Sequence, residues 1–239
     1  MEERKKFVSQ FERSELLFGV DSTEKLKAAT VAVFGLGGVG SYATEALARA
    51  GIGHLVLVDN DTVSESNLNR QLFALHSTLG QKKTEVATLR VRDIHPDIRV
   101  TTWNLFFDES TLPNFDFSSY SYVVDAIDTV GSKILLAQRC YEAGVPEICC
   151  LGTGNKREPS RFCVEDLAKT SVCPLARVMR RELKQRGIPH LPVVYSEEEP
   201  AHVCLSENGR HIPGSCSFVP PVAGMILAGE VVKNLLKNP

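Results

Sequence analysis

The chain has 239 residues, enough for one large domain or two small ones with a substantial core. Its 43% hydrophobic and 23% charged residues are ordinary for a globular protein, and the net charge of −2 argues against coating nucleic acid by bulk charge. The N-terminus is charged and has no apolar segment typical of a secretory signal. The apolar stretch 218–232 is too short to span a bilayer and contains Glu230, so we expect a cytoplasmic protein with no membrane span.

Seven cysteines in a chain without an export signal predict reduced thiols and not a disulfide framework. No Cys-x-x-Cys pair exists in the sequence, so we expect no structural zinc. Three cysteines fall in segments that look like helix or strand and are expected in the core: Cys140, Cys149 and Cys150.

Strand and helix signals alternate along the chain up to about residue 151. Short apolar, β-branched runs predict strands at 30–34, 54–58, 98–103, 122–127 and 145–151. Helix formers and terminating residues predict helices at 41–50, 82–95 and 132–143. Repeated strand–helix–strand units predict a doubly wound, Rossmann-like α/β fold with a mostly parallel sheet. Beyond Gly154 the pieces are shorter and rich in proline, which predicts an irregular C-terminal extension.

A glycine-rich turn follows the first predicted strand and opens the first predicted helix. Its glycines are Gly35, Gly37, Gly38 and Gly40. Glycines let a phosphate approach the backbone, and the helix N-terminus offers free N–H groups. Asp59 ends the next strand, 19 residues after Gly40, where an acid commonly holds a ribose hydroxyl. This pattern predicts a nucleotide site and leaves NAD, FAD and ATP open.

A polar loop after Asp59 favours ATP over a dinucleotide. It carries acidic, amide and cationic side chains: Asp61, Asn67, Asn69, Arg70, Gln71, Lys82 and Lys83. A dinucleotide diphosphate needs few cations beyond the glycine turn, whereas an enzyme acting on a triphosphate must stabilise charge that develops in the transition state. We expect Asp61 and Gln71 to belong to the nucleotide site.

Two acids stand at the end of the fourth predicted strand, where ligands bind in doubly wound sheets. We expect Asp125 to be a structural or helix-capping acid and Asp128 to hold Mg²⁺ or to position the attacking group. Lys133 follows within a turn or two and either faces the same phosphates or lies in solvent.

Together these motifs resemble the ubiquitin-activating-enzyme-like adenylyltransferases, which adenylate carboxylates with ATP and Mg²⁺. The resemblance covers about residues 13–151 and implies one adenylating domain, with a nucleotide-binding half at about 28–151 and a substrate-facing half at about 152–239. It implies that the glycine turn lines the ATP site and that Asp59 holds the ribose. It further implies phosphate contacts for Asn67, Arg70 and Lys83, catalytic roles for these three and Asp128, and metal binding by Asp128.

The same resemblance implies a homodimer. Arg13 resembles an arginine that dimers of this family offer to the ATP site of the partner. Whether a sulfur-transfer partner or a monovalent cation also binds is left open by the sequence.

The C-terminal half resembles one branch of the family, the tRNA threonylcarbamoyladenosine dehydratases. The resemblance lies in Val164–Thr170, in the run that begins at Pro174 and in the segment 215–224. It implies adenylation of the threonyl carboxylate on a modified tRNA adenosine, followed by internal displacement of AMP to give a cyclic product. The alternative is adenylation of the C-terminal glycine of a ubiquitin-like sulfur carrier, although the Cys-x-x-Cys pairs of that branch are missing.

A basic segment supports an RNA partner. Residues 156–186 contain nine basic and four acidic side chains, a local charge of +5. Four of the basic residues have the spacing of one helix face and are candidate tRNA contacts: Arg177, Arg180, Arg181 and Lys184. The other interpretation of this stripe is a solvated helix face.

A covalent acyl intermediate needs a cysteine outside the predicted core. The candidates are Cys173, Cys204 and Cys216, of which Cys216 is retained as a weak covalent candidate. If the activated carboxylate is attacked from within its own substrate, no enzyme nucleophile is required.

Overall fold

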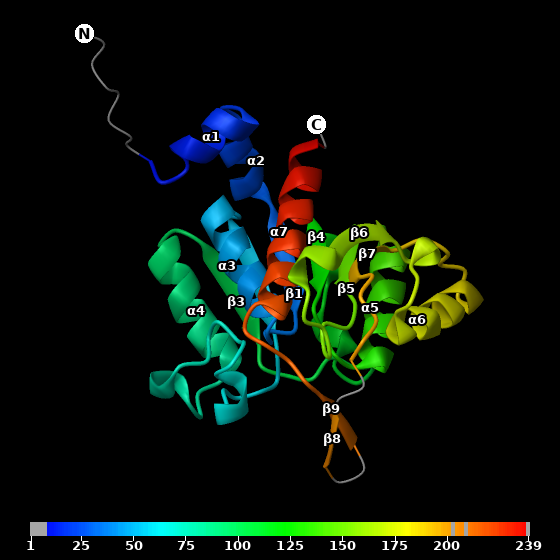
Figure 1. Cartoon of the computed structure of the whole chain (residues 1–239). Helices are drawn as coiled ribbons and strands as arrows, with labels where there is room; N and C mark the ends of the chain where they lie inside the picture. The colour runs from blue at the N-terminus through cyan, green and yellow to red at the C-terminus, as the bar shows by residue number, and fades with distance from the viewer. Residues whose placement is uncertain (1–8, 202–203, 208–209, 238–239) are drawn as a thin grey trace.

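Seven strands of the computed structural model form one sheet in the order β3-β2-β1-β4-β5-β7-β6 (Figure 1); the structure describes residues 9–201, 204–207 and 210–237. The strands in chain order are β1 (Thr30–Phe34), β2 (His54–Val58), β3 (Arg99–Trp103), β4 (Tyr122–Asp125), β5 (Glu147–Cys150), β6 (Phe162–Asp166) and β7 (Pro192–Ser196). Every neighbouring pair is parallel except β6 and β7. The prediction of a mostly parallel, doubly wound sheet is confirmed.

Helices cover both faces of the sheet. The first face carries α3 (Gly40–Ala50), α4 (Lys83–Ile94) and α7 (Val219–Lys237), and the second carries α5 (Val130–Ala143) and α6 (Pro174–Gln185). On the second face, a cluster of phenylalanines takes the place of a helix beneath β1 and β2: Phe34, Phe107, Phe115 and Phe117. Two short helices, α1 (Glu12–Phe18) and α2 (Ser22–Ala28), precede β1.

Short elements fill the connections. Single 3-10 turns lie at Glu65–Asn67, His76–Thr78, Leu112–Asn114, Phe117–Ser119, Pro159–Arg161 and Leu167–Lys169. A two-stranded ribbon, β8 (Cys204–Glu207) with β9 (Arg210–Pro213), projects beyond the sheet in Figure 1.

The predicted strands and helices of the first half are all present, with small shifts at their ends. One of the larger shifts is in β4, which ends at Asp125 and not at Ile127. Asp125 Oδ1 accepts a hydrogen bond from the Ile127 amide at 2.9 Å, which turns the chain out of the sheet. Asp128 therefore lies in the loop after β4. The C-terminal part contains more regular structure than the sequence indicated, since β6 and β7 extend the sheet and α7 has 19 residues.

Helix α7 is the apolar segment of the C-terminal part and is longer than the stretch seen in the sequence. Its length and its mean hydropathy of 1.3 would permit a membrane crossing by composition alone. In the fold, however, half of that window is buried, and the buried side chains pack against α3 and the sheet. At Gly224 the backbone of α7 packs directly against the start of α3, because a Cβ at this position would lie 2.3 Å from the Val39 carbonyl oxygen.

Gly224→Ala should therefore destabilise the protein by about 2–3 kcal/mol, because a methyl group must push α7 away from α3. Gly229→Ala is the matched control on the same helix, since nothing lies within 4 Å of a Cβ there. It should be neutral or stabilise the protein by up to about 1 kcal/mol through helix propensity. Urea unfolding of both variants checks this, and equal effects of the two substitutions would contradict the packing argument.

Candidate functional site

A cavity of about 650 Å³ lies at the carboxyl ends of β1 and β4. These strands are neighbours, and the sheet grows in opposite directions from them, toward β2 on one side and β5 on the other. This reversal of strand order is where doubly wound sheets bind their ligands. Ten residues predicted from the sequence line the cavity: Gly35, Gly37, Gly38, Asp59, Asp61, Asn67, Arg70, Gln71, Lys83 and Asp128.

The glycine turn after β1 forms the floor of the cavity, and sterics require glycine at two of its positions. Gly35 has φ +89°, and a Cβ there would lie 2.6 Å from the Ala126 carbonyl oxygen of the loop after β4. A Cβ on Gly40 would lie 1.7 Å from the Gly35 carbonyl oxygen. Gly40 does not line the cavity. The structure gives it a packing role in closing the turn, which the sequence pattern did not separate from ligand binding.

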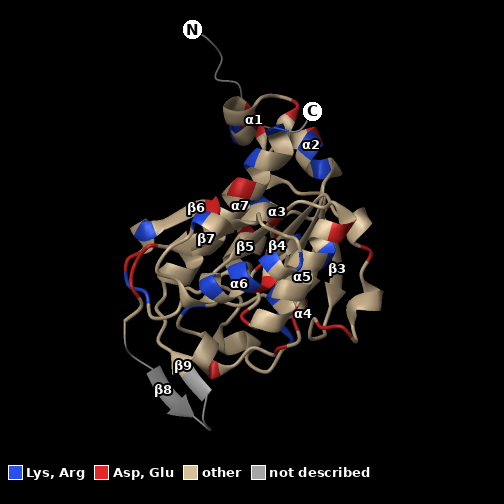
Figure 2. Cartoon of the chain, turned by 90° about the vertical axis from the view of Figure 1, so that its right-hand side faces the viewer, with Lys and Arg blue, Asp and Glu red and all other residues tan. Residues whose placement is uncertain are grey.

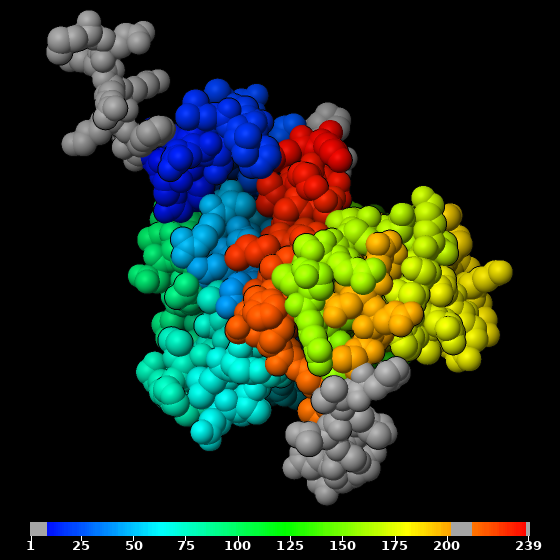
Figure 3. Space-filling model, in the orientation of Figure 1, coloured from blue at the N-terminus to red at the C-terminus, as the bar shows by residue number. Residues whose placement is uncertain are grey.

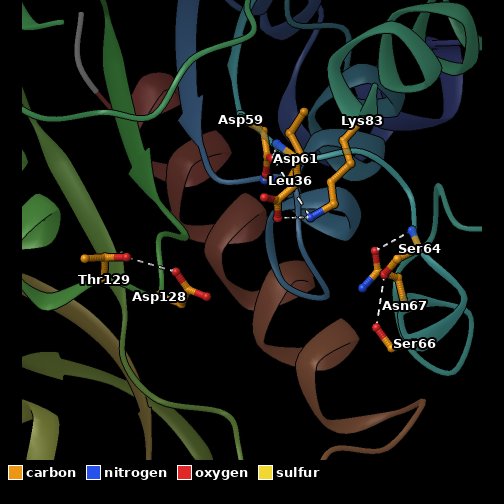
Figure 4. A network of polar contacts seen from close by, with 9 residues as sticks. All are labelled: Leu36, Asp59, Asp61, Ser64, Ser66, Asn67, Lys83, Asp128 and Thr129. Atoms are coloured by element: carbon orange, nitrogen blue, oxygen red, sulfur yellow. Dashed lines mark hydrogen bonds and ion pairs between the residues drawn. The ribbon is translucent and has the colours of Figure 1, made fainter. Parts of the chain in front are cut away.

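Asp59, at the end of β2, joins the glycine turn to the polar loop. Its Oδ2 accepts the Leu36 amide at 2.6 Å and its Oδ1 accepts the Asp61 amide at 2.8 Å (Figure 4). Burial raises the pKa of Asp59, although Lys83 and the two amides act in the opposite direction. A carboxylate has further lone pairs beyond these two bonds, so it can still accept a ribose hydroxyl.

Lys83, the first residue of α4, is buried beside the two acids. Its Nζ lies 2.7 Å from Asp61 Oδ2 and 3.9 Å from Asp59 Oδ1. Figure 4 shows this group on one side of the site and Asp128 on the other. Lys83 therefore enters the cavity from a paired and oriented position, as a residue that contacts phosphate should.

The polar loop lies against the glycine turn. Asn67 is buried, and its Oδ1 accepts the Ser64 amide at 3.1 Å, which fixes the short turn that precedes Arg70. Gln71 is also buried, and its Nε2 lies 3.9 Å from where a Cβ on Gly37 would be. The cluster of amides and a guanidinium that the sequence singled out is thus brought to the glycine turn.

Asp128 is exposed in the loop after β4, and its Oδ1 accepts the Thr129 hydroxyl at 3.3 Å. Among the described residues no group of three or more His, Cys, Asp or Glu side chains could hold a metal ion. A single carboxylate nevertheless fits Mg²⁺, which is commonly held by one or two carboxylates together with substrate phosphates.

Asp125 and Lys133 form a fully buried ion pair at the cavity, and Lys133 is part of the cavity lining. The Lys133 Nζ lies 3.0 Å from Asp125 Oδ1 and donates to the Cys150 carbonyl oxygen at 2.8 Å. Burial alone would lower the pKa of Lys133, but the Asp125 carboxylate outweighs it and the pKa is raised. Asp125 is structural, as predicted. The interpretation of Lys133 as a solvent-exposed lysine is wrong, because its exposure is 1%.

The cysteines divide as the sequence suggested except for Cys173, which the sequence retained as a covalent candidate outside the core and which is buried in the core beside α6. Cys140, Cys149 and Cys150 are buried, as predicted. Cys150 also lines the cavity, but burial raises the pKa of its thiol to about 12, so it is a poor nucleophile at neutral pH. Cys216 is half-buried and follows Ser215 of the cavity wall, and the side chain of Cys204 lies outside the described residues.

The basic stripe lies on α6, which lies beside α5 on the outside of the protein (Figure 2). Arg177, Arg181 and Lys184 are exposed. Arg180 differs, because its guanidinium donates to the Leu167 and Thr170 carbonyl oxygens at 3.2 and 2.8 Å and to the Thr170 hydroxyl. Arg180 therefore holds the loop before α6, which leaves three of the four predicted residues to face a partner.

Several cavity residues were not predicted from the sequence. They come from the loops after β3 and β5, the first turn of α6, β9 and the segment that follows it, and the start of α7: Leu105, Phe106, Phe107, Leu151, Gly152, Thr153, Gly154, Leu175, Ile212, Pro213, Ser215 and Pro220. Gly152 directly follows the predicted strand 145–151 and Gly154 lies two residues further on, and this position after a strand was the signal that could have identified them. The others are brought in by tertiary contacts.

The fold and the site are those of a Rossmann-like nucleotide-binding protein. Beside the glycine turn, the cavity also contains Asn67, Arg70 and Lys83, which are candidates for contacts with phosphate. The chain belongs to the ThiF family, whose model matches residues 11–239. It is 42% identical to the tRNA threonylcarbamoyladenosine dehydratase of Bacillus subtilis over 96% of this chain and 95% of that protein. The Escherichia coli tRNA N6-threonylcarbamoyladenosine dehydratase in complex with ATP superposes with a TM-score of 0.87 at 33% identity, over 95% of this chain and 94% of that one. The molybdopterin-synthase adenylyltransferase of Salmonella typhimurium is 41% identical over 58% of this chain and 56% of its own.

Glu147, at the start of β5, provides a test of the buried charges behind the cavity. Burial raises the pKa of Glu147 well above 4.5, and the nearby Asp125 adds to this. The folded protein therefore keeps a proton that the unfolded chain releases, so stability falls as the pH rises above the unfolded pKa. Glu147→Gln should flatten the fall in unfolding free energy between about pH 5 and pH 8.

Urea unfolding across this pH range measures the slope. Glu142→Gln on α5 is the control, because Glu142 is exposed and its pKa is lowered by hydrogen bonds from Gln138 and Arg139. An unchanged slope in Glu147→Gln would mean that Glu147 is ionised in the folded protein.

Proposed function

We propose that the protein is an ATP-dependent tRNA threonylcarbamoyladenosine dehydratase of the cytoplasm. The observation that carries the proposal is the 42% identity to the Bacillus subtilis dehydratase over nearly the whole of both chains. The similarity to the molybdopterin-synthase adenylyltransferase covers 58% of the chain. The C-terminal half, where the sequence resembles the dehydratases, contributes Ile212, Pro213 and Ser215 to the cavity.

The chemistry is an adenylation followed by ring closure. The threonyl carboxylate attacks the α-phosphorus of ATP and pyrophosphate leaves, which gives an acyl-adenylate. A nucleophilic atom of the same modified nucleoside then attacks the acyl carbon, AMP leaves with the bonding electrons, and the nucleophile loses its proton. The nucleoside has then lost one water in total, and ATP has become AMP and pyrophosphate.

The cavity supplies the charges that this chemistry requires. Asp59 would hold the ribose, while Asn67, Arg70 and Lys83, which line the cavity from the polar loop and α4, would contact the phosphates. Positive groups held in advance where charge develops are an effective way to lower the barrier. Asp128 would hold Mg²⁺ on the opposite wall, where the ion would neutralise phosphate oxygens.

The exposed face of α6 is the proposed contact with tRNA. Leu175, in the first turn of this helix, lines the cavity, so the helix begins at the site and runs outward. Arg177, Arg181 and Lys184 follow at increasing distance along the helix and could contact successive phosphates. Arg180 is left out of this role because its guanidinium is bonded to the loop before α6.

We also propose that two copies form a dimer through the surface of α1, at the edge of the molecule in Figure 3. Its apolar side chains are unusually exposed, with Leu16 at 79% and Leu17 at 75%. Arg13 is exposed on the same helix, which lies at the amino ends of the strands, opposite the cavity (Figure 1). In this arrangement Arg13 would serve the cavity of the partner and not its own.

Purified protein with ATP, Mg²⁺ and tRNA that carries threonylcarbamoyladenosine should yield a nucleoside lighter by one water, as measured by mass spectrometry. Arg70→Ala should lower this rate by at least about 100-fold with an unchanged melting temperature, because a preorganised cation is lost from the phosphate site. Arg92→Ala is the control, because it removes the same charge from an exposed arginine in the last turn of α4. Its rate should be that of the native protein.

An unchanged nucleoside in the presence of bound ATP would contradict the dehydratase function. Pyrophosphate exchange that is stimulated by a sulfur-carrier protein ending in Gly-Gly, and not by tRNA, would establish the alternative.

The dimer can be tested by mixing two inactive variants. Arg13→Ala and Asp128→Asn should each be inactive, because each removes one component of a shared site. After subunit exchange, half of the dimers are mixed and each has one intact site, so about a quarter of native activity should return. Leu17→Glu should yield monomers in analytical ultracentrifugation, whereas Tyr141→Glu, exposed at 59% on α5, should not. No recovery of activity in the mixture would place Arg13 outside the partner's site.

A further inference from the structure

Asn69 has no role in the proposed chemistry, yet its side chain joins two parts of the site. Its Oδ1 accepts the Arg70 Nη1 at 2.8 Å, and its Nδ2 donates to the Ser215 carbonyl oxygen at 3.2 Å. The bond from the guanidinium identifies the amide oxygen, because a guanidinium can only donate. The amide nitrogen must then face Ser215, which lines the cavity from the segment before α7.

The guanidinium of Arg70 is held at one nitrogen only. Arg70 Nη1 donates to the Ser66 carbonyl oxygen at 2.9 Å as well as to Asn69. Among the described residues no acceptor bonds its Nε or Nη2, so these N–H groups remain for a ligand in the cavity that Arg70 lines. A guanidinium anchored at one edge presents its other edge in a fixed direction, which suits binding of phosphate oxygens.

The stem of Arg70 is also confined. A Cβ on Gly38 would lie 3.4 Å from Arg70 Cγ and 3.0 Å from Pro220 Cβ, so the glycine turn, Arg70 and α7 are in contact. Asn69 adds the polar link between the same parts through Ser215. The Asn69 amide is therefore the group that links the Arg70 guanidinium to the segment before α7.

We propose that Asn69 is a positioning residue for ATP, which fixes the Arg70 guanidinium toward the phosphates and ties it to the segment before α7. This inference rests on the proposed use of ATP. Asn69 acts through Arg70 and not on the nucleoside part of the ligand, so its effect depends on the phosphates.

The test compares the affinities of ATP and adenosine for the full chain, with adenosine measured by competition against a fluorescent ATP analogue. Asn69→Ala should weaken ATP binding about tenfold, as expected when a hydrogen bond to a charged group is lost. Adenosine affinity should change by less than about twofold. In the Arg70→Ala background, the additional Asn69→Ala change should have no further effect on ATP affinity. Asn114→Ala is the matched control, because this exposed asparagine also donates to a backbone carbonyl oxygen, at 2.9 Å, and does not line the cavity.

Equal losses of ATP and adenosine affinity would show a general structural defect and overturn the inference. Native ATP affinity in Asn69→Ala, or additive losses in the double variant, would also overturn it. If the ATP pattern is as expected and no cyclic nucleoside forms, the dehydratase function fails and the role of Asn69 stands. If the native chain cyclises the nucleoside and Asn69→Ala binds ATP normally, only the inference fails. A native chain that binds no ATP would refute both.

Discussion

The buried ion pair of Lys133 with Asp125 determines the shape of the candidate site. Lys133 reaches from α5 to the carboxyl ends of two adjacent strands, where it pairs with Asp125 of β4 and binds the Cys150 carbonyl oxygen of β5. The loops that leave these ends carry Asp128 on one side and the 152–154 segment on the other. Taking two charges out of water costs free energy that their attraction does not reliably return. We therefore interpret the pair as fixing the relative positions of the carboxyl ends of β4 and β5.

The first half of the fold could be predicted because its signals are local. β1 and β2 are short runs of apolar residues. A parallel strand buried on both faces is recognised by such a continuous apolar run and shows no alternation of polar and apolar residues. The glycine turn was recognisable because sterics at Gly35 and Gly40 permit no other residue without rearrangement. The polar loop was recognisable by composition, and the sheet topology then brought it to the cavity. What composition did not show is that Gly40 packs within the turn, while its neighbours line the cavity.

The rest of the site depends on contacts between residues far apart in the chain. No periodicity distinguishes Lys133 from a surface lysine, because its partner Asp125 lies on another element. Arg180 has the spacing of a surface stripe, but the loop before α6 offers it carbonyl oxygens that the helix itself cannot provide. The segment 212–220 reaches the cavity only because α7 packs against α3. Such pairings follow from the complete fold and leave no local signature.

These long-range contacts make the two halves of the chain one structural unit. β7 and β6 continue the sheet beyond β5, and Gly224 places α7 directly against the backbone at the start of α3. Nucleotide-facing and substrate-facing residues consequently share one cavity wall and one core. An acyl-adenylate formed there would lie between residues of both halves, which would hold the activated carboxyl group beside a nucleophile of the same substrate. In a reaction whose nucleophile belongs to the substrate, this positioning serves the purpose that a catalytic cysteine would serve elsewhere.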